Sequence, residues 1–157
     1  GMKEILDVLG KFGIITSDSD AGKLSKVTVT IWGTGSPLRE FMNSGDMADA
    51  CVFVMEKVDV KDIISVHKSG NPDPGYHAPH FINIGTGQEI SIRDLAYKIK
   101  ALTGFSGNIV FDPAKPDGTM RKTIDISALH GLGYRHKTDL DEGLKLTYDQ
   151  YLSGSNL

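Results

Sequence analysis

The spacing of apolar residues along the chain predicts five helices. In the first, Ile5, Val8, Leu9 and Phe12 recur every three or four positions, which places them on one side of a helix. Another helix opens at Ser91, where a polar cap residue precedes an apolar stripe that runs up to Gly104. The expected helices cover residues 3–12, 46–57, 91–103, 126–131 and a last segment that begins at Thr138 with Asp141 in its first turn.

Shorter β-branched and aromatic runs predict three strands. The clearest is 27–32, where Val27, Val29 and Ile31 alternate with polar residues and so share one face. The other two are 80–84 and 108–111. Polar, glycine-rich or proline-rich stretches at 16–26 and 67–79 are predicted to be loops. Helices that alternate with strands in this way are typical of an α/β domain.

The amino-acid composition of the chain argues against some classes of binding partner, as follows from its charge and apolar content. The chain has 157 residues, 39% of them hydrophobic, and a net charge of -3, so a large basic surface for nucleic acid or anionic lipid is not expected. No apolar run reaches the roughly 18 residues that cross a bilayer, and no secretory leader is recognisable. The one cysteine, Cys51, lies on the apolar stripe of helix 46–57, so it is expected in the core and in a reducing, cytoplasmic setting.

Two strands are each followed by a Gly-Thr-Gly sequence, at 33–35 and 85–87. Neither has the third glycine of a dinucleotide fingerprint or a helix directly after it, so both are expected to be tight turns that bind no cofactor. None of the five tyrosines has a lysine four positions later, so no catalytic residue is predicted. His77 and His80 are the histidines spaced closely enough for a metal, and without a further ligand cluster no metal site is expected.

Candidate ligand contacts cluster in two blocks. Arg39 can bind a diphosphate with two hydrogen bonds, and Trp32 can offer a flat apolar wall to a base or sugar. The residue types alone favour the alternative, with Trp32 in the core and Arg39 in a surface ion pair with Glu40 or Asp46. In the second block, 115–122, Lys122 offers a point charge for phosphate. Asp117 could accept hydrogen bonds from a guanine edge, but its residue type favours a turn.

Several segments, in the same order, resemble GDP-L-fucose synthases, which are extended short-chain reductases. The more specific ones are WGTGSPLREF (32–41) and KPDGTMRK (115–122). The less specific ones are GDMADACVFVME (45–56), HFINIGTGQEISIRDLA (80–96) and DLDEGLKLTYDQYL (139–152). Residues 1–26 match poorly. The resemblance implies a carboxyl-terminal substrate domain with few short strands and about five helices, and without the Rossmann half.

The resemblance also implies a function and a set of site residues. Enzymes of this family convert GDP-4-keto-6-deoxymannose to GDP-L-fucose with NADPH, and their catalytic residues lie upstream of the segments matched here. Trp32 would line the nucleotide site, Arg39 would hold the diphosphate, and Lys122 would add positive charge, with Asp117 as a fourth substrate contact. We therefore expect residues 1–26 to form a leading helix and variable loop, and 27–157 a nucleotide-sugar-binding domain.

On this interpretation the chain alone is inactive and binds no cofactor, and NADPH belongs to the full-length enzyme. An orphan half of an enzyme would also expose apolar surface that favours self-association or docking of the missing Rossmann half. Two other hypotheses remain open. The chain could be a stand-alone nucleotide-sugar-binding module without catalysis, or part of another nucleotide-sugar epimerase or dehydratase, which base preference would separate.

Overall fold

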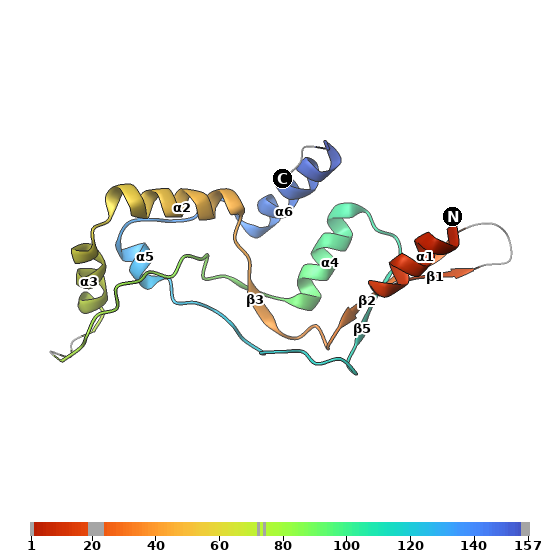
Figure 1. Ribbon diagram of the computed structural model, residues 1–157, viewed down its shortest axis with the longest axis horizontal. Coiled ribbons are helices and arrows are strands. Elements are labelled where there is room, and N and C mark those ends of the chain that lie inside the picture. The colour runs from red at the N-terminus through yellow and green to blue at the C-terminus, as the bar shows by residue number, and fades with distance from the viewer. Residues whose placement is uncertain (1, 19–23, 72, 74, 155–157) are drawn as a thin grey trace. The chain divides into compact units, whose positions relative to one another are not determined.

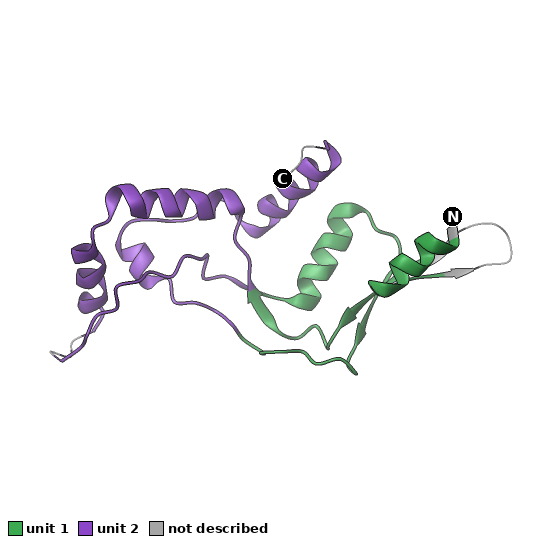
Figure 2. Ribbon diagram, viewed as in Figure 1, with its two compact units in different colours: residues 1–39, 90–121 green, residues 40–89, 122–157 purple. Residues whose placement is uncertain are grey.

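The computed structural model describes residues 2–18, 24–71, 73 and 75–154 (Figure 1). Within this part the chain has six helices and five short strands and forms two compact units (Figure 2). Unit 1 comprises residues 1–39 and 90–121, and unit 2 comprises 40–89 and 122–157. The predicted mixed α/β class is confirmed. None of the described helices is long and apolar enough to cross a membrane.

Unit 1 is built on a three-stranded sheet in the order β1-β2-β5. Strand β1 (Ile14–Asp18) pairs antiparallel with β2 (Leu24–Trp32), and β5 (Asn108–Asp112) pairs parallel with β2. The predicted strands at 27–32 and 108–111 are therefore confirmed. Helix α1 (Met2–Lys11) precedes β1, and helix α4 (Ile92–Thr103) precedes β5.

Helix α4 begins and ends where its sequence predicts. The Ser91 side chain accepts a hydrogen bond from the Asp94 amide at 3.0 Å, which satisfies one of the free N–H groups of the first turn. Gly104 ends the helix in the left-handed region, with φ of 67°. These two caps fix the length of the helix that leads the chain back into the sheet of unit 1.

Unit 2 is helical and holds the buried core. Its helices are α2 (Ser44–Lys57), α3 (Val60–Ser69), α5 (Ser127–Gly131) and α6 (Leu140–Leu152). The buried aliphatic and aromatic residues of the described chain lie in this unit: Ala50, Ile63, Ala128, Leu129 and Tyr134. The chain passes between the units three times: within β3 (Leu38–Glu40), within β4 (Glu89–Ser91) and between residues 121 and 122. Strands β3 and β4 pair with each other.

The predicted strand at 80–84 is wrong, because these residues have no regular structure. Ile82 and Ile84 instead pack against the core of unit 2, which explains their apolar character without a strand ladder. The strand in this region is β4, further along the chain. A short apolar run does not by itself separate a strand from an irregular segment that lies against a core.

The predicted loop at 16–26 is wrong at both ends, since β1 and β2 extend into it and residues 19–23 lie outside the described part. Pairing between the strands prevails over their polar composition. Helix α3 was not predicted, and it takes the first three residues of the expected loop at 67–79. Helix α6 is capped by Asp139, whose side chain accepts from the Glu142 amide, and not by Thr138.

The expected burial of helix α2 is also partly wrong. Cys51 is exposed, and Met55 is 84% exposed, although both lie on the predicted apolar stripe. The helix packs instead through Ala50, Phe53 and Val54. Its buried face is thus narrower than the stripe of apolar residues.

Candidate functional site

The carboxyl ends of β2 and β5 form one edge of the sheet in unit 1. Trp32 and Asp112, the last residues of these strands, are register partners, and the Gly33 amide donates to the Asp112 carbonyl at 2.9 Å. The loops that follow both strands therefore leave from the same edge. They meet again where the Leu38 amide donates to the Met120 carbonyl at 2.8 Å. In open α/β sheets, ligands bind outside the carboxyl ends of parallel strands.

Asp117 joins these two loops. One carboxylate oxygen accepts from the Thr34 amide at 2.6 Å, and the other accepts from the Thr34 hydroxyl at 2.7 Å. Gly33 has a φ of +80°, and a β-carbon there would overlap the Asp117 carboxylate. Glycine at position 33 is therefore required both by the backbone conformation and by the close approach of the acid.

Arg93, at the start of α4, holds the other side of the same turn. Its guanidinium donates to the Thr34 carbonyl and lies 4.1 Å from the centre of the Phe111 ring, a cation–π distance. Its backbone amide donates to the Gly35 carbonyl at 2.8 Å. The polar backbone groups of Thr34 are thus bound from both directions, which rigidifies the turn.

Trp32 lies at this edge with its side chain open to solvent. The residue is 69% exposed, so the alternative that placed it in the core is wrong. The Lys115 ammonium lies 5.6 Å from the centre of the indole ring. An exposed indole beside a cation offers a flat apolar surface and positive charge to one ligand.

Arg39 lies against the loop that carries Asp117. It is half-buried, and its guanidinium donates to the Leu38 carbonyl at 2.6 Å. A β-carbon on Gly118 would lie 4.0 Å from the Arg39 Nη2 atom. Trp32, Arg39 and Asp117 therefore all belong to the edge of unit 1. The fourth predicted residue, Lys122, is exposed and belongs to unit 2.

The chain is similar to known proteins in sequence and in structure. Residues 13–67 match the family described as "NAD dependent epimerase/dehydratase family". Over 124 residues the chain is 44% identical to GDP-L-fucose synthase 1 of Arabidopsis thaliana, covering 79% of the chain and 33% of that protein. It is 40% identical over 128 residues to the GDP-L-fucose synthase of Escherichia coli, covering 82% of the chain and 37% of that protein.

The chain is a portion of a protein of the GDP-L-fucose synthase family. It spans about a third of the length of the curated relatives it matches. A solved structure named as a GDP-6-OMe-4-keto-L-xylo-heptose reductase from C. jejuni matches 99% of the chain with a TM-score of 0.78 and 38% identity, over 39% of that structure. A GDP-D-glycero-L-gluco-heptose synthase from Campylobacter jejuni, solved in the presence of NADPH, matches 97% of the chain with a TM-score of 0.75 and 38% identity, over 38% of that structure.

The second Gly-Thr-Gly turn of this family member is held in the same manner, in unit 2. One Glu40 oxygen accepts hydrogen bonds from the amides of Thr86 and Gly87, the latter at 3.0 Å. It also lies 3.4 Å from the Thr86 hydroxyl. The sequence showed the two turns as a local similarity but gave no sign of the acids, because each acid lies far along the chain from its turn.

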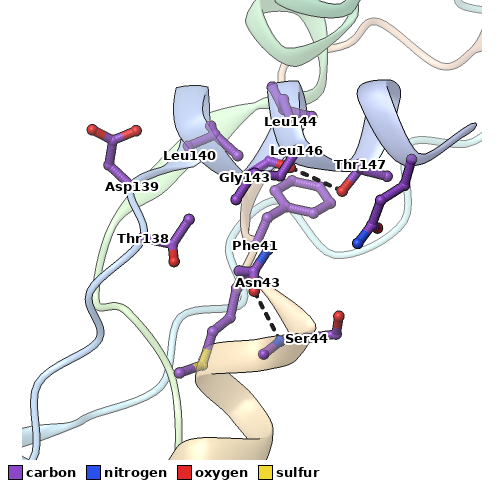
Figure 3. A pocket seen from close by; sticks show the side chains of 13 residues that line it. Phe41, Asn43, Ser44, Thr138, Asp139, Leu140, Gly143, Leu144, Leu146 and Thr147 are labelled. Carbon is purple, nitrogen blue, oxygen red and sulfur yellow. Dashed lines mark hydrogen bonds between the residues drawn. The ribbon is translucent and has the colours of Figure 1, made fainter. Parts of the chain in front are cut away.

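A hollow of about 510 Å³ in unit 2 is lined by residues 41–45, 138–140, 143, 144, 146, 147 and 150 (Figure 3). The Phe41 ring points toward α6 in this view. The polar groups here already cap helices: the Asn43 side chain accepts from the Gly45 amide at 2.8 Å, and that of Asp139 accepts from the Glu142 amide at 2.8 Å. The capping side chains in this hollow are therefore already hydrogen-bonded within the protein, and they offer no free charged group to a ligand.

Other titratable groups of interest lie in the body of unit 2. Burial lowers the pKa of His130, and the nearby Arg135 and His136 lower it further. His77 and His80, the predicted pair at metal spacing, are both exposed. Among the described residues, no group of three or more His, Cys, Asp or Glu side chains could hold a metal ion.

The structure brings three of the predicted residues, Trp32, Arg39 and Asp117, into unit 1, and two residues that were not predicted as site residues lie beside them. Arg93 was part of a predicted helix, and Lys115 was part of the block 115–122. The signal for Lys115 was present, since it opens the family-specific block 115–122. Nothing in the spacing linked Arg93 to residue 34, because that contact depends on how α4 packs.

Proposed function

We propose that this chain is the substrate-binding portion of a GDP-L-fucose synthase and that it binds the GDP moiety at the carboxyl edge of β2 and β5. The observation that carries the proposal is the exposed indole of Trp32, the last residue of β2, in the same unit as Arg39 of β3. The names of the relatives support the choice of ligand, because those quoted above are all enzymes of GDP-sugars.

Each proposed contact follows from the chemistry of its side chain. The Trp32 ring stacks on the base, because an exposed aromatic face offers a large apolar surface at little entropic cost. The Arg39 guanidinium binds the diphosphate, for which its planar fork of N–H groups is suited. Lys115 adds charge beside the ring. For Lys122 the proposal rests on the family resemblance of block 115–122 alone.

In the whole protein we propose the reaction of the family, in which GDP-4-keto-6-deoxymannose is epimerised and then reduced with NADPH to GDP-L-fucose. The Gly-Thr-Gly turns of this chain do not fit the cofactor. A dinucleotide diphosphate binds at a helix N-terminus, whereas these turns lead into β3 and β4. The chain therefore contributes substrate contacts, and hydride transfer belongs to other residues of the whole protein.

Binding of GDP to the purified chain, measured by calorimetry, tests the proposal. GDP is expected to bind more tightly than UDP or dTDP. Arg39→Ala should weaken GDP binding by about 1.5–3 kcal/mol, the usual value of a charge-assisted hydrogen bond. Lys3→Ala, which removes an exposed charge from α1 in the same unit, is the matched control and should leave the affinity unchanged.

The competing outcomes are distinct. Unchanged GDP affinity in Arg39→Ala removes this residue from the site. Tighter binding of UDP or dTDP assigns the chain to another nucleotide-sugar epimerase or dehydratase. Oxidation of NADPH by the pure chain with the keto-sugar substrate contradicts the proposal that the chain alone is inactive.

A further inference from the structure

Asp117 and Thr34 lie 83 residues apart in the sequence but meet in unit 1 through two short hydrogen bonds. Both carboxylate oxygens are engaged, one by the backbone and one by the hydroxyl of the same threonine. Thr34 and Asp117 are each half-buried. Each oxygen of this acid thus accepts one hydrogen bond from Thr34, which occupies about two of the four lone-pair sites of the carboxylate.

The turn that Asp117 holds comes directly after Trp32. Because the indole is 69% exposed, packing around the ring does little to orient it. Its direction is therefore set by the backbone on either side. On one side Trp32 pairs in register with Asp112 of β5, and on the other the Gly33-Thr34-Gly35 turn is held by Asp117.

We propose that Asp117 is a positioning residue for the nucleotide: through Thr34 it fixes the turn that orients Trp32, and it does not itself read the base. This inference rests on the proposed function, in which GDP stacks on Trp32. It differs from the expectation drawn from the family resemblance, in which Asp117 contacts the substrate.

The second turn supports a structural role for such an acid. In unit 2, Glu40 binds the amides of the Gly85-Thr86-Gly87 turn with one carboxylate oxygen. That turn belongs to unit 2, and Glu40 of β3 binds the amide of its central threonine, as Asp117 does at the first turn. A carboxylate that is distant in the sequence therefore holds each of the two turns.

Two substitutions of Asp117 separate positioning from base reading. In Asp117→Asn, the amide oxygen still accepts from the Thr34 amide, and the amide nitrogen donates to the Thr34 hydroxyl, so the turn stays held. If Asp117 instead accepted hydrogen bonds from the N1–H and N2–H groups of guanine, Asp117→Asn would place its –NH2 donor against one of these donors and weaken binding. Asp117→Ala removes both kinds of contact.

The experiment is calorimetric titration of each variant with GDP and with ADP. We expect Asp117→Ala to weaken the binding of GDP and of ADP by the same factor, about tenfold. The factor is the same because the lost hydrogen bonds affect either base only through the position of Trp32. Asp117→Asn should bind GDP within about twofold of the parent chain. Thr34→Val, which loses the hydroxyl but keeps the amide, should fall between the two. Asp7→Ala, an exposed acid on α1, is the control.

A base-reading acid gives the opposite pattern. Asp117→Asn would then weaken GDP binding as much as Asp117→Ala does, and the ratio of GDP affinity to ADP affinity would fall in both variants. Either result overturns the positioning role, provided that the far-ultraviolet circular dichroism of the variants matches that of the parent chain.

A second readout does not depend on nucleotide binding. Trp32 is the one tryptophan of the chain, so its fluorescence anisotropy reports the motion of this ring alone. Asp117→Ala should lower the anisotropy, and Asp117→Asn should not. If the parent chain binds no GDP, the proposed function fails, and unchanged anisotropy in Asp117→Ala then shows that the acid does not hold the ring either.

Discussion

Gly33 occupies a position that only glycine tolerates, for two separate reasons. Its φ of +80° lies in the left-handed region, and its α-carbon faces the Asp117 carboxylate so closely that a β-carbon would overlap it. Gly104 has a similar φ of +67°, but a β-carbon there would meet no atom within 4 Å. Substitutions at Gly33 and Gly104 therefore separate the cost of backbone strain from the cost of steric overlap.

Gly104→Ala is expected to lower the free energy of unfolding by about 1–3 kcal/mol, the usual cost of a strained backbone conformation. Gly33→Ala should lower it further, because it also displaces Asp117 from Thr34. Urea unfolding followed by Trp32 fluorescence measures both variants. Equal losses in the two variants would show that the approach of Asp117 to the turn contributes nothing.

At the scale of elements, Asp46 joins the start of α2 to the segment before α6. Its buried carboxylate accepts from the Thr138 amide at 2.8 Å and from the Lys137 amide at 3.2 Å. The Tyr134 hydroxyl donates to its backbone carbonyl at 2.6 Å. Burial alone raises the pKa of Asp46, but the hydrogen bonds from Thr138 and Lys137, with a smaller contribution from His136, bring the pKa below its usual value.

Asp46→Asn should lower the free energy of unfolding by about 1.5–3 kcal/mol at pH 7, since hydrogen bonds to a charged acceptor are lost. Because the folded pKa lies below the usual 3.8, the charged group stabilises the fold above about pH 4. That stabilisation disappears as the pH falls through the folded pKa, so the gap between the two proteins should close in acid.

Urea unfolding from pH 7 down to pH 3 checks this dependence. Asp49→Asn is the control, because Asp49 is exposed and its ion pair with Lys137, at 2.8 Å, is screened by solvent. It should have a much smaller effect at pH 7. A gap for Asp46→Asn that stays constant across the pH range would contradict the lowered pKa.

At the scale of the whole molecule, burial is divided unevenly between the two units. The five buried aliphatic and aromatic residues of the described chain all belong to unit 2, and two of them, Ala50 and Leu129, have 0% exposure. Unit 1 depends instead on the strand ladder of β1, β2 and β5 and on the hydrogen bonds of its loops. Apolar burial is the main source of stability, so unit 1 is expected to open more readily.

Hydrogen exchange should therefore be faster at the amides of β2 and β5 than at those of α2 and α5. Addition of GDP should slow exchange in the loops after β2 and β5, because a ligand stabilises the state that binds it. Mass spectrometry of peptic fragments measures both effects. Equal protection of the two units without ligand would show that the loops and ladder of unit 1 compensate for its lack of buried apolar residues.

Local signals in the sequence predicted local structure well. Helix α4 has its cap at Ser91 and its stop at Gly104, because those side chains act within one turn of their own backbone. The strand at 27–32 followed from β-branched alternation. Predictions were wrong where a distant partner decides: β1 forms by pairing with β2 despite its polar residues, and the apolar residues 80–84 pack on a core without a ladder.

The sequence by itself determined the family and the α/β class, because residue types in a specific order carry that information without coordinates. It also proposed Trp32 and Arg39 as substrate contacts, which stays a prediction. The tertiary structure alone decided that Trp32 is exposed, that Cys51 is not in the core, and that Asp117 and Glu40 each hold a Gly-Thr-Gly turn. The physical reason is distance along the chain. The Asp117–Thr34 and Glu40–Thr86 hydrogen bonds join residues that are 83 and 46 positions apart. Such bonds depend on how the elements pack, and no local pattern specifies that packing.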